Sequence, residues 1–212
     1  MDNLDQLYDA IIAGNAKVSA SLTQAAVADG MDPQRLLDEA MIPAMDEVGR
    51  RFEANECFVP ELLIAARAMK AGVAVIRPLL AAQASKSAGR VVIGTVKGDL
   101  HDIGKNLVAI MLEGGGFEII DIGVDAHPDK FVDAIHANQP DIVALSALLT
   151  TTLPSMKNII DQLVQAGVRD RVKVIIGGAP VTQDFADEIG ADGYSDNAAA
   201  AVTLARKLLS PA

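Results

Sequence analysis

Residues 90–106 read RVVIGTVKGDLHDIGKN, and this stretch decides the fold. Its first seven residues form a short run rich in β-branched side chains, which is typical of a buried strand. A loop of glycine and polar residues follows, and a helix-like pattern begins near Gly104. A buried strand that leads through such a loop into a helix is the opening unit of a parallel α/β domain.

The same alternation repeats to the end of the chain. Further strands are predicted at 118–122, 141–146, 173–176 and 193–194, and further helices at 128–138, 154–166, 182–189 and 197–209. Apolar strands that alternate with helices predict a parallel sheet covered on both faces. Five such units indicate a doubly wound, five-stranded, flavodoxin-like (Rossmann-like) α/β fold, in which ligands bind beyond the carboxyl ends of the strands near the switch point.

The first part of the chain has a helical period instead and predicts a small α-helical bundle of four to five helices. Asp32 and Pro33 form a helix start signal, with a capping carboxylate followed by proline at the first helical position. Pro43 should kink or split the helix that follows. The expected domains are a helical bundle over 1–87 and an α/β domain over 88–212, joined by a small, polar linker or frayed helix end at 81–89.

Composition narrows the function classes. The 212 residues include 28 acidic and 18 basic ones, and the net charge of −10 argues against a nucleic-acid surface or an electrostatic grip on an anionic membrane. No apolar run approaches the ~20 residues of a membrane span. The acidic N-terminus does not resemble a signal peptide, and the single cysteine, Cys57, cannot form an internal disulfide. We therefore expect a cytoplasmic protein without nucleic-acid or membrane partners.

Three loops should lie along the carboxyl edge of the sheet, at 97–106, 146–152 and 177–180. Only the first carries a histidine. A glycine-rich connection that places phosphate at a helix start is one interpretation of this loop, although it lacks the Walker pattern. A phosphoacceptor receiver domain fits poorly, because Ser146 stands where its acceptor aspartate would be. A zinc site needs three or four ligands, and no second His or Cys is nearby in the sequence.

Asp99 and His101 favour a different interpretation. A carboxylate two residues before an imidazole can accept a hydrogen bond from one ring nitrogen, which leaves the other nitrogen as a lone-pair donor to a metal. One protein ligand suffices when a macrocycle supplies the rest of the coordination sphere. Gly104 lets the backbone turn beside a bulky ligand. Asp125 also follows a predicted strand, but the sequence does not decide whether it lines the site.

The three loops together resemble the DxHxxG…SxL…GG pattern of cobalamin-binding domains. The matching residues are Asp99, His101 and Gly104, then Ser146 and Leu148, then Gly177 and Gly178. The whole chain resembles the corrinoid proteins of methanol, methylamine and methoxyarene methyltransferase systems, and also the cobalamin-binding module of methionine synthase. This resemblance covers both the bundle and the α/β part.

The resemblance implies a cobalamin or related corrinoid bound with its own base displaced, and His101 as the lower axial ligand of cobalt. Asp99 would orient His101, and Thr152, where the methionine synthase module has a hydroxyl residue, would extend the pair into a relay. In the bundle, Phe52 and Val59 match apolar positions that cap the upper face of the corrin, although both could equally be core residues. The other residues expected to bind the corrinoid are Gly98, Asp102, Gly104, Ser146, Leu148, Thr150, Gly177, Gly178 and Ala198.

The function that this resemblance implies is that of a methyl shuttle. Such a protein accepts a methyl group on cobalt from a substrate-specific methyltransferase and presents it to a second, acceptor methyltransferase, and a reductive activase serves it. It carries the cofactor and is not a catalyst alone. The alternatives are a cobalamin-dependent sensor, a cobalamin storage or delivery protein and an adenosylcobalamin mutase subunit. The sequence does not name the methyl donor.

Overall fold

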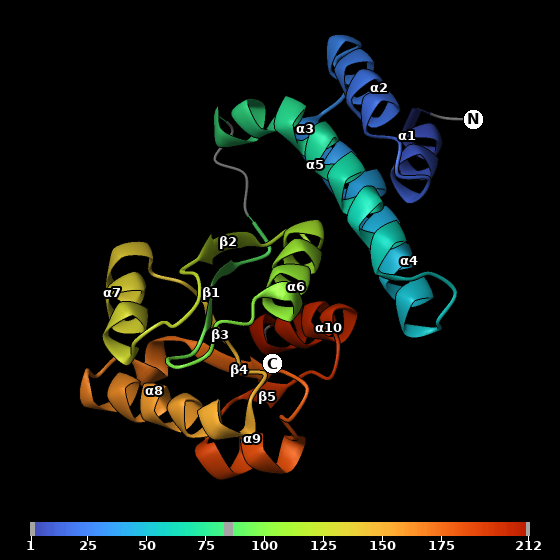
Figure 1. Cartoon of the computed structure of the whole chain (residues 1–212). Coiled ribbons are helices and arrows are strands. Elements are labelled where there is room, and N and C mark those ends of the chain that lie inside the picture. Colours follow the sequence, from blue (N-terminus) through green and yellow to red (C-terminus); the bar gives the residue numbers. More distant parts are fainter. Residues whose placement is uncertain (1–2, 83–86, 211–212) are drawn as a thin grey trace. The chain divides into compact units, whose positions relative to one another are not determined.

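The structure is a computed structural model that describes residues 3–82 and 87–210 (Figure 1). It divides into two compact units. One comprises Met1–Ser87 with Gly114–Gly116, and the other comprises Ala88–Glu113 with Phe117–Ala212. Of the predicted linker at 81–89, residues 81 and 82 still belong to a helix, and residues 83–86 lie outside the described residues.

The first unit is α-helical. Its elements are α1 (Asn3–Ile12), α2 (Ala16–Ala28), α3 (Pro33–Leu36), η1 (Leu37–Met41), α4 (Ile42–Glu53) and α5 (Val59–Ala82). The start signal at α3 is confirmed, because Pro33 is in the first turn and the Asp32 carboxylate accepts a hydrogen bond from the Gln34 amide. Pro43 has the expected effect as well: it lies in the first turn of α4, and the π-helical η1 separates that helix from α3.

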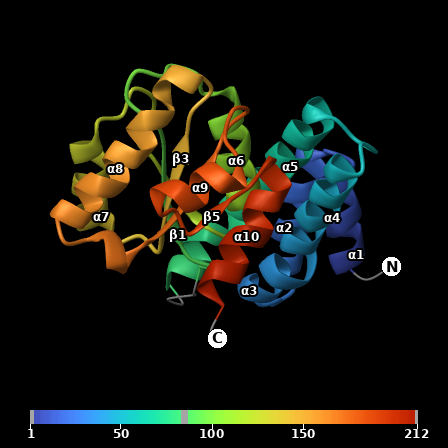
Figure 2. The ribbon, with the colours of Figure 1, turned by 90° about the horizontal axis from the view of Figure 1, so that it is seen from below.

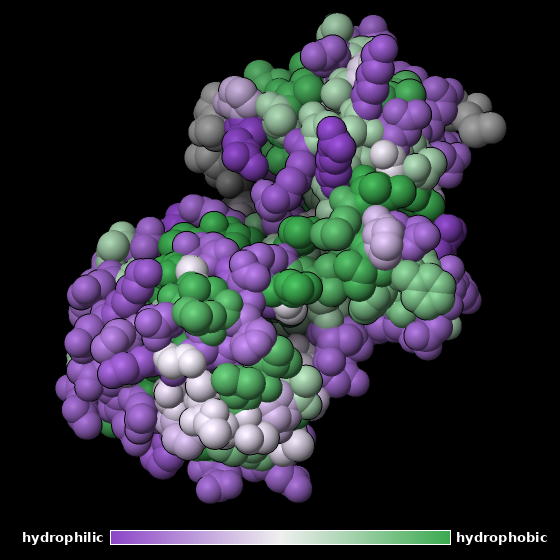
Figure 3. Space-filling view, in the orientation of Figure 1, coloured by the Kyte–Doolittle hydropathy of each residue, from purple (hydrophilic) through white to green (hydrophobic). Residues whose placement is uncertain are grey.

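Close packing between α2 and α5 holds this unit together. Gly72 of α5 faces Ser19 and Thr23 of α2, and a Cβ at Gly72 would lie only 3.0 Å from the Ser19 hydroxyl oxygen. Large apolar side chains, among them Leu7, Leu36, Met41, Met45, Leu62 and Ile76, fill the interior. Other apolar side chains at the start of α5, such as Leu63 and Ile64, are exposed, and Figure 3 shows apolar surface along this helix.

The second unit is a five-stranded α/β domain. Its strands are β1 (Arg90–Thr95), β2 (Glu118–Asp121), β3 (Ile142–Ser146), β4 (Lys173–Gly177) and β5 (Gly193–Tyr194). Its helices are α6 (Ile103–Gly114), α7 (Pro128–Asn138), η2 (Thr150–Thr152), α8 (Leu153–Gln165), η3 (Arg169–Arg171), α9 (Gln183–Ile189) and α10 (Ala198–Leu209). The strand order is β2-β1-β3-β4-β5 and every pair is parallel, which confirms the flavodoxin-like prediction.

Helices cover both faces of this sheet. Figures 1 and 2 show α7, α8 and α9 on one face and α6 and α10 on the other. The strands carry buried aliphatic side chains toward both layers, as expected for a parallel sheet. Phe131 of α7 is the largest fully buried side chain and packs in one cluster with residues of β1, β3, β4, α8 and α9.

The register of the sheet places the three predicted loops at one edge. Thr95 pairs with Ser146, and Ser146 pairs with Gly177, so β1, β3 and β4 end in one row. The chain leaves β1 for α6 on one face and leaves β3 for α8 on the other. The switch point of the sheet therefore lies between β1 and β3, where the first two loops separate.

We predict that Phe131→Ala lowers the free energy of unfolding by about 3–5 kcal/mol, because it opens a cavity between α7 and the sheet. Val164→Ala on α8 is the matched control, since Val164 is 59% exposed and should change stability by no more than about 0.5 kcal/mol. Urea unfolding measures the free energy of unfolding of both variants. Equal effects of the two substitutions would contradict this assignment of the core.

Candidate functional site

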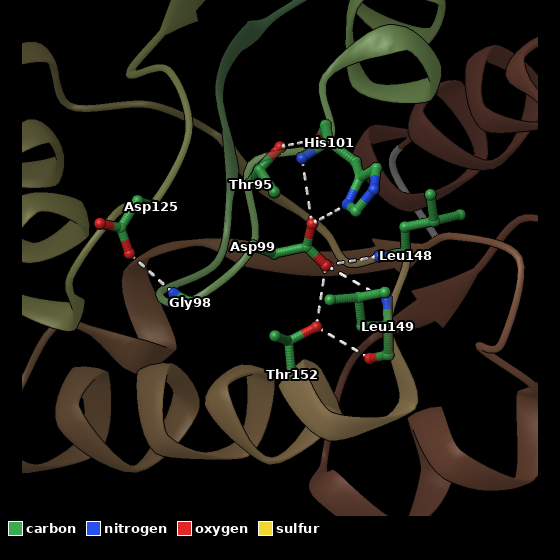
Figure 4. Close-up of polar contacts among 8 residues, drawn as sticks. All are labelled: Thr95, Gly98, Asp99, His101, Asp125, Leu148, Leu149 and Thr152. Carbon is green, nitrogen blue, oxygen red and sulfur yellow. Dashed lines mark hydrogen bonds and ion pairs between the residues drawn. The ribbon is translucent and has the colours of Figure 1, made fainter.

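The Asp99 carboxylate is fully buried at the switch point and accepts five hydrogen bonds (Figure 4). Its Oδ1 lies 3.0 Å from the backbone nitrogen of His101 and 2.7 Å from the ring Nδ1 of the same residue. Its Oδ2 accepts from the amides of Leu148 at 2.8 Å and Leu149 at 3.2 Å, and from the Thr152 hydroxyl at 2.8 Å. The predicted trio of Asp99, His101 and Thr152 is thus brought together around one side chain.

These hydrogen bonds set the charge of Asp99 and the tautomer of His101. Burial alone raises the pKa of Asp99. Hydrogen bonds from the backbone and ring of His101, the Leu148 amide and the Thr152 hydroxyl outweigh burial and hold this pKa well below its usual range. An ionised carboxylate is only an acceptor, so the proton between the two side chains belongs to Nδ1. Nε2 of the neutral ring then carries the lone pair, on a side chain that is 50% exposed.

Hydrogen bonds between side chains and the loop backbone hold the loop that carries Asp99 and His101. The buried hydroxyl of Thr95, at the end of β1, donates to the His101 carbonyl at 2.9 Å. Ser155 of α8 donates to the Lys97 carbonyl at 3.0 Å, and the Gly98 amide donates to the Asp125 carboxylate at 2.7 Å. Thr95 and Ser155 are not among the site residues predicted from the sequence. A hydroxyl at the last position of an apolar strand is the signal that could have indicated Thr95.

The glycines of the site differ in what surrounds them. Gly178 has a φ of +137°, and a Cβ there would lie 1.9 Å from the Ala147 carbonyl oxygen. Only glycine therefore lets the loops after β3 and β4 approach each other. A Cβ at Gly177 would lie 3.3 Å from the Ser195 carbonyl oxygen, whereas none of the described atoms lies within 4 Å of one at Gly104. Gly104 therefore borders open space beside His101.

Large apolar side chains around His101 are exposed. Ile103 is 81% exposed and Leu100 is 71% exposed, and Leu148 and Leu149 of the second loop are exposed as well. We call these four residues the apolar rim. Leaving such side chains in water at one place is unfavourable, and clusters of this kind mark binding sites. Of these four residues, only Leu148 is among those predicted from the sequence. The signal for Leu100 and Ile103 is two aliphatic residues within an otherwise polar loop.

The remaining predicted residues lie at element ends. Ser146 ends β3, Thr150 begins the short η2 helix, and Ala198 is the buried first residue of α10. Asp102 is exposed and accepts a hydrogen bond from the Asn106 side chain at 3.1 Å. None of the five hydrogen bonds that the Asp99 carboxylate accepts comes from these four residues.

Phe52 and Val59 belong to the helical unit. Phe52 is half-buried in the last turn of α4, and Val59 is the exposed first residue of α5. Neither is a fully buried core side chain.

The site fits a corrinoid. It offers one imidazole nitrogen, oriented through the other ring nitrogen by a buried carboxylate, which is the arrangement typical of a histidine that binds a metal. The apolar rim and the open space at Gly104 suit a bulky, largely apolar ring beside that nitrogen. Within residues 3–82 and 87–210, no three His, Cys, Asp or Glu side chains form a metal-binding group by themselves. In the same part of the chain, no helix has the length and apolarity needed to cross a membrane.

We predict that Asp99→Asn destabilises the protein most at neutral pH. Because the native pKa of Asp99 lies below its unfolded value of about 3.9, the ionised form contributes stability above that pH. This contribution is lost as the pH falls through the native pKa, at no more than about 1.4 kcal/mol per pH unit. The difference in unfolding free energy between wild type and variant should therefore narrow from pH 7 to pH 3 in urea titrations. A constant difference would contradict the assigned charge.

Comparison with known proteins agrees with this geometry. Two family models, each described as a B12 binding domain, match residues 4–77 and 89–203. Trimethylamine corrinoid protein 1 of Methanosarcina acetivorans is 44% identical over 203 residues, covering 95% of this chain and 94% of that protein. The dimethylamine corrinoid protein of Methanosarcina barkeri is 43% identical over 98% of this chain and 97% of its own length.

Solved structures agree as well. A cobalamin-binding protein from Desulfitobacterium hafniense superposes with a TM-score of 0.81 at 33% identity, covering 98% of both chains. The methanol:cobalamin methyltransferase complex of Methanosarcina barkeri contains a chain that matches with a TM-score of 0.87 at 30% identity, covering 98% of this chain and 79% of that one. The chain therefore belongs to the family of B12-binding corrinoid proteins.

Proposed function

We propose that this protein is a methyl shuttle that holds a corrinoid through His101 and carries a methyl group between two methyltransferases. The observation that carries this proposal is the half-exposed imidazole, whose Nδ1 is bound to the buried Asp99 carboxylate, on a loop that also carries the exposed Leu100 and Ile103. The cofactor is a cobalamin or related corrinoid, which is what the family binds. When bound, the corrinoid supplies the transfer chemistry, because its cobalt can accept a methyl group and release it.

In this proposal His101 would be the residue that holds the cobalt of the corrinoid. Asp99 keeps the proton on Nδ1, so that Nε2 presents its lone pair away from the buried carboxylate. It also limits rotation of the ring, because the same Oδ1 binds the His101 amide. The apolar rim would contact the corrinoid and keep water away from it.

Thr152 is proposed as the third member of a proton relay. Its single hydroxyl hydrogen has two acceptors at equal distance, Asp99 Oδ2 and the Leu149 carbonyl, both 2.8 Å away. A hydroxyl can donate to only one of them at a time, so rotation about its C–O bond can strengthen or weaken the hydrogen bonding of Asp99. Threonine provides this hydroxyl as serine would, and its methyl group packs toward Gly98.

The other residues of the site complete the proposed corrinoid pocket. Ser146 and Thr150 would contact the buried nucleotide tail, and Gly177 and Gly178 would shape the turn beside it. The remaining proposed contacts in the α/β part are Gly98, Asp102, Gly104, Leu148 and Ala198. In the helical part, which we propose to be a cap domain over 1–87 preceding the cobalamin-binding domain over 88–212, Phe52 and Val59 would cover the upper face of the ring.

The proposed partners follow from this role. A solved relative is part of a methanol:cobalamin methyltransferase complex, and two curated relatives are named for trimethylamine and dimethylamine. We propose a substrate-specific methyltransferase as the donor partner, a second methyltransferase as the acceptor partner, and a reductive activase that restores the cofactor. A cytoplasmic location is part of the same proposal, and the single cysteine supports it.

We predict that protein reconstituted with hydroxocobalamin and reduced to cobalt(II) shows a histidine nitrogen splitting in its electron paramagnetic resonance spectrum. His101→Ala should abolish that splitting, because the variant lacks the Nε2 donor. His136→Ala is the matched control, since His136 is an exposed residue in the last turn of α7. The same axial nitrogen signal in His101→Ala would refute the assigned ligand.

Methyl transfer separates the shuttle from the alternatives. We predict that the methylated protein loses its methyl group to a thiol acceptor in the presence of an acceptor methyltransferase, at a rate that rises with the concentration of that enzyme. His101→Ala should transfer more slowly by about an order of magnitude or more, and His136→Ala should match the wild type. A storage protein or a sensor would transfer no methyl group in this assay.

A further inference from the structure

Asp125 has an unusual backbone conformation in the loop between β2 and α7. Its φ is +48°, in the left-handed region that costs free energy for residues other than glycine. Such a conformation persists when surrounding contacts require it. Two contacts do so here: the Asp125 carboxylate accepts the Gly98 amide at 2.7 Å, and the Asp125 amide donates to the Asp99 carbonyl at 3.0 Å.

These two hydrogen bonds hold the loop on both sides of the Gly98–Asp99 peptide, and Figure 4 shows the one from the Gly98 amide to the Asp125 carboxylate. The backbone of Gly98 is also in the left-handed region, with a φ of +85°, so both partners of this hydrogen bond have a positive φ. Backbone hydrogen bonds next to them tie this loop to the end of β1, because the Thr95 amide donates to the Gly123 carbonyl and the Ala126 amide donates to the Thr95 carbonyl, both at 2.9 Å. The loop after β2 thus fixes the backbone from which the Asp99 side chain enters the interior.

We propose that Asp125 is a positioning residue for the Asp99–His101 pair. It acts through the Gly98 amide and touches neither His101 nor the Asp99 carboxylate. This inference rests on the proposed ligation of cobalt by His101. A rotation of the Gly98–Asp99 peptide would tilt the carboxylate away from Nδ1, and the imidazole would lose its fixed orientation. Asp125 therefore sets how often His101 is aligned for ligation.

This role requires two properties of Asp125, its acceptor oxygen and its positive φ, and different substitutions test each of them. Asn keeps an acceptor oxygen at the same position and tolerates a positive φ. Gly tolerates the backbone conformation better than Asp does but removes the acceptor. Ala removes the acceptor and adds backbone strain. Asp125→Gly therefore isolates the side-chain hydrogen bond, and Asp125→Asn tests whether the carboxylate charge matters. Asp133→Ala on the exposed face of α7 is the control for loss of one acidic residue.

The first readout is amide hydrogen exchange of the protein without cofactor. We expect Asp125→Gly to speed exchange at Gly98 by about tenfold or more, because the variant lacks the carboxylate that accepts the Gly98 amide. Asp125→Asn should stay within about threefold of wild type, and Asp133→Ala should leave Gly98 unchanged. Exchange in the core strand β3 should be the same in all variants, which shows that folding is intact.

The second readout is the ratio of histidine-ligated to unligated cobalt(II) at saturating hydroxocobalamin, from the nitrogen splitting in electron paramagnetic resonance. We expect Asp125→Gly to lower this ratio by about three- to tenfold, with Asp125→Asn and Asp133→Ala close to wild type. If the wild type shows the splitting and Asp125→Gly keeps the same ratio, the positioning role is wrong while the proposed function stands. If the wild type shows no histidine splitting, the proposed function fails and the positioning role fails with it.

Discussion

The rest of the site depends on one buried charge, the carboxylate of Asp99. A carboxylate removed from water is costly unless hydrogen bonds replace its hydration. Here five donors do so, and they come from the loop after β1, the loop after β3 and the helical turn before α8. The same side chain therefore joins two segments of the chain and fixes an imidazole. The stability of these two segments and the orientation of the His101 imidazole therefore depend on one hydrogen-bond network.

The sheet makes this network possible. In a parallel sheet with the order β2-β1-β3-β4-β5, the chain leaves β1 and β3 toward opposite faces, so a space opens between their carboxyl ends. The shared register of Thr95, Ser146 and Gly177 brings the donors of β3 and its loop level with the acceptor after β1. Gly178 allows the next loop to approach Ala147 without a clash. The protein thereby has a buried polar network around Asp99 that contacts a half-exposed histidine.

The surface above that interior has the opposite character. Leu100 and Ile103 are largely exposed, although residues of this kind normally pack inside. Their exposure is intelligible if an apolar, flat ligand covers them in the working protein, and the family to which the chain belongs binds such a ligand. In the proposed function, buried polar groups would orient the metal ligand, and exposed apolar groups would contact the ring.

The sequence by itself determined much of this protein. The periodicity of residues 90–106 and its repetition predicted the parallel sheet, the Asp32–Pro33 signal predicted a helix start, and the two-residue spacing of Asp99 and His101 predicted their hydrogen bond. These are local properties of a chain. Only the tertiary structure decided which donors complete the Asp99 network, that Asp125 binds Gly98, and that Leu100 and Ile103 remain exposed. Those contacts join residues 27 to 53 positions apart, and their distances depend on the order and register of the strands, which no local pattern specifies.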